Sequence, residues 1–384
     1  MKLYSGVTGM YKAGNDKKRP SRRLYSSTGV VAAALLINSM AGLLPDGAAV
    51  AGDIAAARAV LMPADTRMAA AIDEMRSTAP EVYPQHYVAD NQGHARFGGY
   101  NALDQAAYVA ALNEYAELLP EDVRLYNMLV PTSAAFDLDD AYAVLFPDQH
   151  QIISEVQQAL DERFAGVDIW DALAAHQGEY LYFRTDHHWT ALAGYYAYAE
   201  LGRVLGYQPC QLSDLTQVDS GVAFLGSIYQ ATGSHQLAVG YDELCYYRLP
   251  YQVEHVYWDN SGRPKVTEGV YKEWYYRQNN KYAFFMGGDL PYIRLRTDAG
   301  TGRKLAVIKD SYANTVLPLL TAHFDEIHVI DPRNSNFNAL DIIEDNDIKD
   351  VLFINYARVV CLPEFSNGLL ELTQRQSVEI QPVP

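Results

Sequence analysis

Apolar runs and helically spaced apolar residues alternate along the last third of the sequence. Residues 304–310, 326–331 and 350–357 are short, nearly uninterrupted apolar runs rich in β-branched residues, which is typical of buried strands. Between them, 312–324 and 337–346 carry apolar residues at helical spacing. This alternation predicts parallel strands that are covered on both faces by helices.

The same pattern extends toward the N-terminus in a looser form. Residues 123–131 form another buried strand pattern, and 148–164 have the spacing of an amphipathic helix. A short aromatic strand is expected at 180–183, followed by a loop and a long helix that runs from Thr190 and is closed by Gly206. These elements predict a three-layer α/β/α fold with a mostly parallel sheet.

A tyrosine-rich segment at about 240–283 interrupts this regular pattern. The region from 208 to 283 has the alternation of strands and hairpins, with the residues DNSGRP, 259–264, as a turn. Tyrosine is a good strand former, so packing is the first explanation for these side chains, and stacking on sugar rings is the alternative. We therefore interpret 240–283 as an insertion in the α/β domain.

The N-terminal part is organised differently. Nearly all charged residues in 1–28 are basic, an apolar run follows at 29–44, and Ala49-Val50-Ala51 resembles a signal-peptide cleavage site. We interpret 1–51 as a basic leader with an apolar export signal or membrane anchor, and 52–94 as a helical lead-in. The remaining residues, 95–384, form the expected catalytic domain.

Net charge and cysteine content narrow the classes of function. The formal net charge is -17, so clustered contacts to nucleic-acid phosphates or to an anionic membrane surface are not expected. The 3 cysteines, Cys210, Cys245 and Cys361, are widely separated and form neither a disulfide framework nor a CxxC metal motif. Three inert buried cysteines are favoured over one disulfide with a leftover thiol.

Ser311 lies between the strand pattern 304–310 and the helix pattern that follows it. A serine at such a turn stands at the carboxyl edge of a parallel sheet, where the active sites of open α/β folds are built. It could act as a nucleophile, or it could simply cap the helix. Asn314, in the first turn after it, could add a hydrogen-bond donor for an oxyanion.

A histidine and a carboxylate that could activate Ser311 occur together at the end of the predicted strand 180–183. Asp186 and His188 have the spacing that lets the acid hold one imidazole nitrogen while the other faces a serine. His187 would then have a structural role or contact the substrate, and Trp189 would pack in the core and so anchor the loop. Binding of a metal by these residues is the weaker alternative, because adjacent side chains diverge and no second ligand cluster completes a set. We expect no metal and no cofactor.

Several motifs together resemble a known family. TDHHWT (185–190), LYNMLVPTS (125–133), VAFLGSIYQATG (222–233), KYAFFMGGDLPYIRL (281–295) and KLAVIKDSYANTVLPLLTAHFDEIHVIDPR (304–333) are similar to the bacterial DHHW proteins, relatives of the alginate O-acetyltransferases. The resemblance covers about 95–365. It implies an SGNH-hydrolase-like fold in which the Asp-x-His motif precedes the serine.

The resemblance also implies roles for individual residues. It assigns the catalytic triad to Ser311, His188 and Asp186, the same residues that the local sequence favours. It further places Gly226 near the site, as a donor to the oxyanion or a turn glycine, and Arg333, as a ligand for a substrate carboxylate or a structural ion-pair residue.

The function expected from these features is O-acetylation of a cell-surface or exported polysaccharide through an acyl-serine. The resemblance implies work outside the cytoplasm, by a secreted or membrane-anchored protein, with a membrane-bound O-acyltransferase supplying acetyl groups. A carbohydrate esterase or deacetylase with the same triad is one alternative. A non-catalytic glycan-binding component of an acetylation complex is the other.

Overall fold

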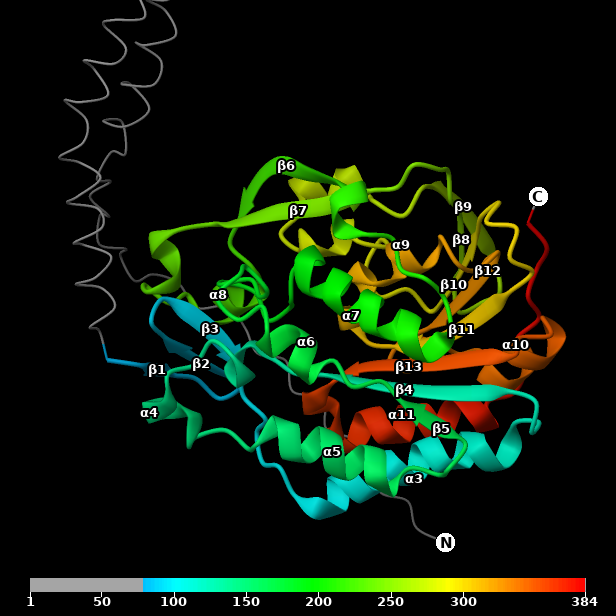
Figure 1. The fold of residues 1–384 in the computed structure, drawn as a ribbon, viewed down its shortest axis with the longest axis horizontal. Helices are drawn as coiled ribbons and strands as arrows, with labels where there is room; N and C mark the ends of the chain where they lie inside the picture. Colours follow the sequence, from blue (N-terminus) through cyan, green and yellow to red (C-terminus); the bar gives the residue numbers. More distant parts are fainter. Residues whose placement is uncertain (1–78, 384) are drawn as a thin grey trace, which may run out of the picture. The chain divides into compact units, whose positions relative to one another are not determined.

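The computed structural model describes residues 79–383 (Figure 1). The predicted leader and export signal or anchor, 1–51, lie outside these residues, as does most of the lead-in. No helix within 79–383 is long and apolar enough to cross a lipid bilayer. The thiols of Cys210, Cys245 and Cys361 are all free, but only Cys361 is buried, so the prediction of burial is wrong for Cys210 and Cys245.

A mixed sheet of eight strands forms the centre of the domain. Its order is β5-β4-β13-β11-β12-β10-β8-β9. The strand bounds are Arg124–Val130 (β4), Phe164–Gly166 (β5), Glu254–Trp258 (β8), Pro264–Glu268 (β9), Tyr292–Arg296 (β10), Lys304–Lys309 (β11), Glu326–Ile330 (β12) and Asp350–Tyr356 (β13). The mixed α/β fold with a large central sheet is thereby confirmed.

The sheet has a parallel and an antiparallel part. Strands β5, β4, β13, β11 and β12 run parallel, whereas β10, β8 and β9 pair antiparallel at the other side. Except for the exposed edge strand β5, the parallel strands are buried on both faces, which explains their uninterrupted apolar runs. Strands β8 and β9, joined across the predicted DNSGRP turn, belong to the Tyr-rich segment. This segment is therefore partly built into the central sheet.

Helices lie on both faces of the sheet, each over its own core (Figure 1). Helices α3 (Ala102–Leu118), α5 (Gln149–Ala159), α10 (Ala339–Asp345) and α11 (Pro363–Gln374) cover one face. Helices α6 (Trp170–Ala174), α7 (Ala191–Leu205) and α9 (Leu317–Leu320) pack over the other. Alternate residues of β11, such as Val307 and Ile308, contribute to the two cores.

The described end of the predicted helical lead-in is a small sheet. Strands β1 (Glu81–Val82), β2 (His86–Ala89) and β3 (Gln92–Ala95) form an antiparallel meander, so the prediction of helix up to 94 is wrong there. Asp90 and Asn91 adopt positive φ in the β2–β3 turn, a conformation that Asp and Asn tolerate well. The alternation of HYVADNQGHA around this turn is a hairpin pattern that the helical interpretation overlooked.

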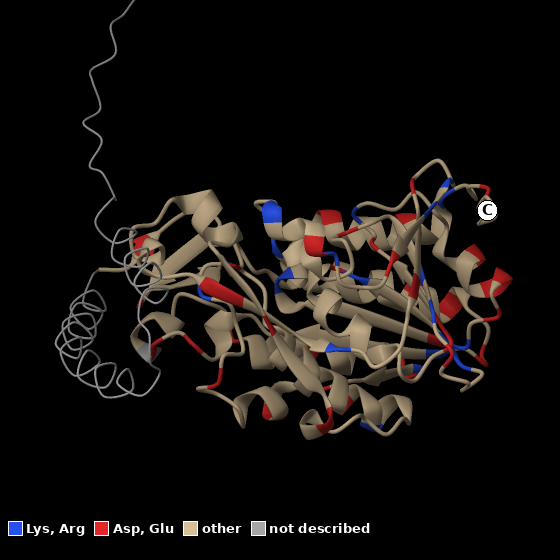
Figure 2. Cartoon of the chain, turned by 90° about the horizontal axis from the view of Figure 1, so that it is seen from above, with Lys and Arg blue, Asp and Glu red and all other residues tan. Residues whose placement is uncertain are grey.

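The remaining elements are short and lie mostly in the loops. Strands β6 (Thr216–Phe224) and β7 (Asp242–Arg248) form a two-stranded sheet. The other helices are α4 (Asp140–Ala143) and α8 (Ser227–Thr232). The 3₁₀ turns are η1 (Ser133–Ala135), η2 (Leu212–Asp214), η3 (Leu237–Val239), η4 (Glu273–Arg277), η5 (Tyr282–Phe284), η6 (Ser311–Thr315) and η7 (Ala357–Cys361). Acidic positions are spread over many of the visible elements (Figure 2).

Candidate active site

Ser311 stands at the carboxyl edge of the parallel strands, as its sequence position predicts. It follows β11 through Asp310, which accepts hydrogen bonds from the N–H groups of Tyr312 at 2.9 Å and of Tyr356, at the end of β13, at 2.8 Å. Asp310 thus ties the turn after β11 to the neighbouring strand. Burial raises the pKa of Asp310 to about 6, although Arg333 and the two N–H groups favour the charged form.

The segment after Ser311 differs from the predicted helix 312–324. It consists of the 3₁₀ turn η6 and, after Val316, the four-residue helix α9. Pro318 has no N–H to donate to Asn314, so a continuous α-helix cannot pass through this point. The turn nevertheless buries all of its five residues and fixes Ser311 at the sheet edge.

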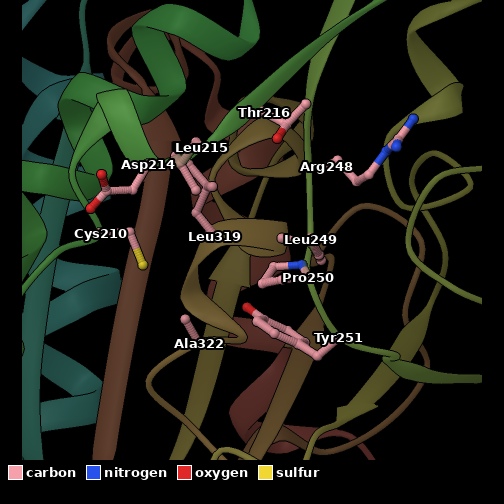
Figure 3. A pocket seen from close by; sticks show the side chains of 10 residues that line it. All are labelled: Cys210, Asp214, Leu215, Thr216, Arg248, Leu249, Pro250, Tyr251, Leu319 and Ala322. Atoms are coloured by element: carbon pink, nitrogen blue, oxygen red, sulfur yellow. The ribbon is translucent and has the colours of Figure 1, made fainter.

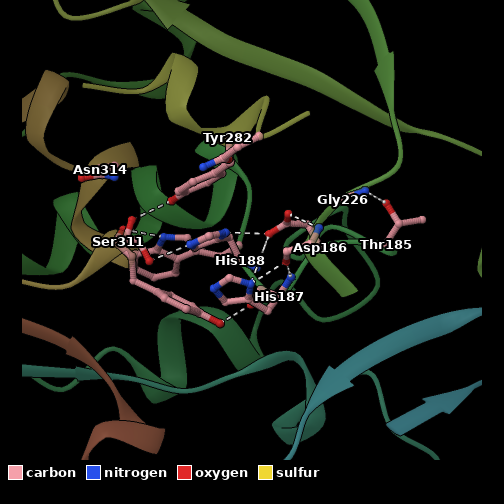
Figure 4. A network of polar contacts seen from close by, with 12 residues as sticks. Thr185, Asp186, His187, His188, Gly226, Tyr282, Ser311 and Asn314 are labelled. Carbon is pink, nitrogen blue, oxygen red and sulfur yellow. Dashed lines mark hydrogen bonds and ion pairs between the residues drawn. The ribbon is translucent and has the colours of Figure 1, made fainter. Parts of the chain in front are cut away.

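The side chains of Ser311, His188 and Asp186 form one hydrogen-bonded line (Figure 4). Ser311 Oγ lies 2.7 Å from His188 Nε2, and His188 Nδ1 lies 2.6 Å from Asp186 Oδ1. A carboxylate at Nδ1 keeps the proton on that nitrogen and leaves Nε2 to accept the hydroxyl proton. Ser311 is 9% exposed, and the other two are buried more deeply. The structure thus brings together the three residues that the sequence suggested.

Asp186 is held in its ionised form by several contacts. Its two oxygens accept the N–H groups of His188 at 3.0 Å and of Ser227 at 2.8 Å, in addition to the imidazole. Burial opposes the charge, but the charge and hydrogen bond of His188, with help from His187, keep the pKa of Asp186 well below its usual range. The carboxylate can therefore stabilise a positive charge that develops on His188.

The loop that carries Asp186 and His188 is a tight turn. The predicted strand 180–183 is reduced to one bridge between Tyr182 and Trp189, with the N–H of Phe183 donating to the His188 carbonyl at 3.1 Å. Trp189 is fully buried and donates its indole N–H to the Tyr312 carbonyl at 2.8 Å. The predicted structural role of Trp189 is confirmed, because it fixes this loop to the turn that holds Ser311.

Two rings enclose the imidazole of His188. Tyr282 stacks on it with ring centroids 3.6 Å apart and planes 4° apart, and its hydroxyl donates to the Ser311 carbonyl at 3.0 Å. His187 lies against His188, with centroids 3.8 Å apart, and its Nδ1 is 2.6 Å from Ser227 Oγ. Burial lowers the pKa of His187 to about 3, so this second imidazole is neutral at physiological pH.

Gly226 does not offer its N–H to the site. That N–H donates to Thr185 Oγ1 at 2.7 Å, so the prediction of an oxyanion donor is wrong. Gly226 is instead a position where the backbone lies very close to Asp186. A Cβ at this position would lie 2.3 Å from the Cβ of Asp186, which only glycine allows. Gly226 thereby lets Asp186 reach His188 and the Ser227 N–H.

Asn314 and Arg333 meet at a carboxylate that the sequence analysis did not single out, Asp289. Asn314 Nδ2 lies 3.3 Å and Arg333 Nη2 lies 2.9 Å from its two oxygens. Arg333 also binds Asp331, at 2.6 Å, and Lys309 bridges the two carboxylates at 2.7 and 3.5 Å. Arg333 is therefore an ion-pair residue, the second of its two predicted roles.

The polar groups that could ligate a metal are those of the loop itself. Within 79–383, one group has this property: Asp186, His187 and His188, whose candidate ligand atoms lie within 4.8 Å of one another. Three of these atoms already have partners, since Nδ1 and Nε2 of His188 contact Asp186 and Ser311, and Nδ1 of His187 contacts Ser227. An ion would have to replace these contacts.

A separate cavity of about 350 Å³ lies at the other end of α9 (Figure 3). Its lining includes Leu319 and Ala322, together with Cys210, Arg248 and Tyr251 from the loops around β6 and β7. None of the residues that line it belongs to the line from Asp186 to Ser311. The chemistry of the candidate site therefore lies at the sheet edge and not in this cavity.

Tyr282 and Asp289 are site residues that the sequence reasoning did not identify. Both lie in KYAFFMGGDLPYIRL, a stretch that carries the family resemblance but has no catalytic pattern of its own. Their side chains form hydrogen bonds and ion pairs with residues that are 20 or more positions away, such as Lys309, Ser311 and Arg333. Local spacing contains no signal for such contacts.

Comparisons with solved structures find this fold in a protein from Eubacterium siraeum and in one from Bacillus cereus, and a weaker similarity in a third protein. A DHHW family protein from Eubacterium siraeum gives a TM-score of 0.70 at 27% identity, over 79% of this chain and 99% of that one. Bacillus cereus PatB1, solved with a sulfonyl adduct, gives 0.63 at 19% identity over 75% and 99%. The O-acetyltransferase domain of Pseudomonas putida AlgJ gives 0.41 at 12% identity over 76% and 99%.

Sequence comparison identifies the family. No curated protein matches the sequence. The family of DHHW proteins, in contrast, matches at residues 71–330, which is more than half of the chain and includes the loop with Asp186 and His188 as well as the turn with Ser311. The chain belongs to the DHHW family.

Proposed function

We propose that this protein is an O-acyltransferase that moves an acetyl group through Ser311 onto a hydroxyl group of a cell-surface or exported polysaccharide. The line of hydrogen bonds from Asp186 through His188 to Ser311 carries the proposal, because it is the arrangement that a serine nucleophile needs. The resemblance of the motifs to relatives of the alginate O-acetyltransferases supports acetyl as the group and a polysaccharide as the acceptor. It also supports an SGNH-hydrolase-like, three-layer arrangement of the domain.

In the first half of the reaction, Ser311 Oγ attacks the carbonyl carbon of the acetyl donor while His188 Nε2 takes its proton. The carbonyl oxygen becomes an oxyanion. We assign its donors to the N–H of Ser311, which has no hydrogen-bond acceptor within 79–383, and to the Asn314 amide. When the donor's C–O bond breaks, His188 returns the proton to the leaving oxygen and acetyl-Ser311 remains.

In the second half, a sugar hydroxyl attacks acetyl-Ser311 and gives its proton to His188 Nε2. The bond between the acetyl carbon and Ser311 Oγ breaks, and the proton returns to Oγ. Asp186 stabilises the imidazolium in both halves, while the stacked Tyr282 keeps the ring in the same plane. The acetyl group is transferred rather than hydrolysed when the bound sugar excludes water from acetyl-Ser311. If water takes the acetyl group, the protein is an esterase.

The setting of the reaction is also part of the proposal. The basic leader and the apolar run at 29–44 support a protein that is exported or anchored at the cell membrane. The resemblance to relatives of the alginate O-acetyltransferases supports a membrane-bound O-acyltransferase as the partner that supplies acetyl groups. The polysaccharide and this membrane protein are the two partners that we propose.

The test is acetyl transfer by the full-length protein from p-nitrophenyl acetate to a polysaccharide, with release of p-nitrophenolate as the measure of the first half. We expect Ser311→Ala to abolish both release and transfer. Ser133→Ala is the matched control, because Ser133 also follows a parallel strand and contacts a histidine, His94, at 2.9 Å. Release that survives in Ser311→Ala would contradict the proposal, and release without transfer to any glycan would favour the esterase.

A further inference from the structure

Arg358 lies in η7, directly after β13, at the same sheet edge as Ser311. The ring of Tyr356 stacks on that of Tyr312, with centroids 5.0 Å apart and planes 13° apart. The hydroxyl of Tyr312 donates to the His187 carbonyl, and Arg358 Nη1 lies 3.4 Å from the hydroxyl of Tyr356. The Arg358 guanidinium is therefore placed at the outer end of a stacked tyrosine pair whose inner member adjoins the nucleophile.

This guanidinium lacks an ionic partner. Within the described chain, no carboxylate lies within ion-pair distance of Arg358, its Nε is buried without an acceptor, and its hydrogen bond to Tyr356 is long. The other described arginines without an ion pair donate to backbone carbonyls or are exposed: Arg96, Arg163, Arg184, Arg248 and Arg277. The Nε of Arg358 is a buried donor without an acceptor, which is costly, and no carboxylate of the described residues pairs with the rest of this partly exposed guanidinium, so Arg358 can take an anion as its partner.

His86, on β2, faces the same region from the small sheet. Its imidazole makes no side-chain hydrogen bond within 79–383. Burial lowers the pKa of His86, the charge of Arg358 lowers it further, and Asp186 raises it, so both groups are within electrostatic reach of this ring. In Figure 4 the blue strands of the small sheet pass on the side of the site where His187 lies. The ring of His86 is thus close enough to Arg358 and to Asp186 to sense the charge of each.

We propose that Arg358, with His86 beside it, binds an anionic substituent of the acceptor glycan, a carboxylate or a phosphate, and so places a neighbouring hydroxyl at Ser311. The planar fork of a guanidinium matches both anions in a bidentate way, which gives orientation as well as affinity. The proposal rests on the proposed function, since it names the class of acceptor for that site. Arg358 is a specificity residue here and takes no part in the acylation of Ser311.

The test compares charged glycans with their neutral counterparts as acceptors for the full-length protein. Oligogalacturonate and its methyl ester test the carboxylate, and a phosphomannan before and after phosphatase treatment tests the phosphate. We expect transfer to at least one charged glycan to exceed transfer to its neutral form by about tenfold or more. Arg358→Ala should remove this preference and Arg358→Lys should keep part of it. Arg248→Ala, which removes an exposed arginine at the separate cavity, should keep all of it.

Three outcomes would overturn the inference. Equal use of charged and neutral glycans would do so, as would an Arg358→Ala variant that keeps the preference. Slower release of p-nitrophenolate by folded Arg358→Ala would place Arg358 in the acylation step instead. If the wild type does not release p-nitrophenolate at all, the proposed function fails, and calorimetric binding of the same glycan pairs to wild type and Arg358→Ala then decides the anion site on its own.

Discussion

Two arginines flank Ser311, and they differ in what they bind. Arg333 donates to Asp331 and Asp289 at 2.6 and 2.9 Å, and its side chain is 37% exposed. Arg358 has no carboxylate partner within 79–383, although its Nε is buried. For Arg333 the sequence left open a substrate ligand and a structural ion pair, and the structure shows the ion pair, whereas Arg358 has no carboxylate to bind in the described part of the chain.

The difference indicates that the residues around Arg333 stabilise the fold and that the residues around Arg358 bind a ligand. We call these two regions the Arg333 side and the Arg358 side. On the Arg333 side, the side chains of Lys309 and Asp331 are completely buried, and Lys309 forms ion pairs with Asp331 and with Asp289. On the Arg358 side, donors are left without acceptors, a cost that a folded protein retains where a ligand offsets it. Variants on the first side should change stability, variants on the second should change acceptor use, and the residues between them should change chemistry.

The largest expected effect lies between the two sides, in the adjacent histidines. His188→Ala should lower release of p-nitrophenolate by about a thousandfold or more, because it removes the base that contacts Ser311. His187→Ala should lower it far less, since His187 contacts Ser227 and not the nucleophile. Steady-state kinetics of both variants checks this, and equal losses would show that the pair acts as a unit.

Asp331→Ala should produce the largest loss of stability on the Arg333 side. It leaves Lys309 and Arg333 with Asp289 as their sole remaining carboxylate, and removing one member of a buried ionic group costs about 3–5 kcal/mol. The free energy of unfolding from urea titration is the measurement. A loss below about 1 kcal/mol would mean that the cluster is not a structural core.

The buried carboxyl of Asp310 should give the unfolding free energy a pH dependence. Its pKa is raised by burial from 3.8 to about 6, so the folded state binds the extra proton and this contribution to stability is present below about pH 4 and lost as the pH rises to about 6. Because Arg333 favours the charged form, Arg333→Ala should steepen that loss, whereas Arg358→Ala should not. Urea titrations between pH 4 and 7 distinguish the variants. If the unfolding free energy of Arg333→Ala had the same pH dependence as that of the wild type, Arg333 would not stabilise the charged form of Asp310.

The smallest effects should come from direct comparison of the two arginines at neutral pH. Arg333→Ala should cost about 1–2 kcal/mol of unfolding free energy, reduced by the solvent that screens its half-buried side chain. Arg358→Ala should change it by less than about 0.5 kcal/mol or even stabilise the protein, because a buried group without a partner is removed. Thermal unfolding of the two variants side by side is sufficient, and a reversed order would contradict the comparison.

Much of the fold could be predicted from the sequence. Strands β4, β11, β12 and β13 were located within about one residue, because parallel strands buried on both faces leave uninterrupted apolar runs. The pairing of Asp186, His188 and Ser311 followed from the Asp-x-His spacing and from a serine at a strand end. The buried Trp189 and the absence of a disulfide among the three cysteines also agree with the predictions, although only Cys361 is buried.

The remaining parts depend on contacts that local patterns do not encode. Pro318 divides the predicted helix 312–324, and the strand 180–183 is a single bridge because the chain turns at once into the Asp186 loop. The role of Gly226 is decided by its distance from Asp186, and that of Arg333 by Asp289. For Gly226 and Arg333 the deciding partner is remote in the sequence, so residue type and spacing suggest a role but not the neighbour that fixes it. The break at Pro318, in contrast, is a local signal, because proline inside a helix pattern ends or kinks the helix.

The most direct test of the central claim, that Ser311 is the acyl-accepting nucleophile, is mass spectrometry of the full-length protein quenched with acid after mixing with p-nitrophenyl acetate. The account predicts an acetyl group on the peptide that contains Ser311 in the wild type and in Arg358→Ala, and no acetyl group there in Ser311→Ala. An acetyl group that maps to another residue, or a folded wild type that never acquires one, would contradict it.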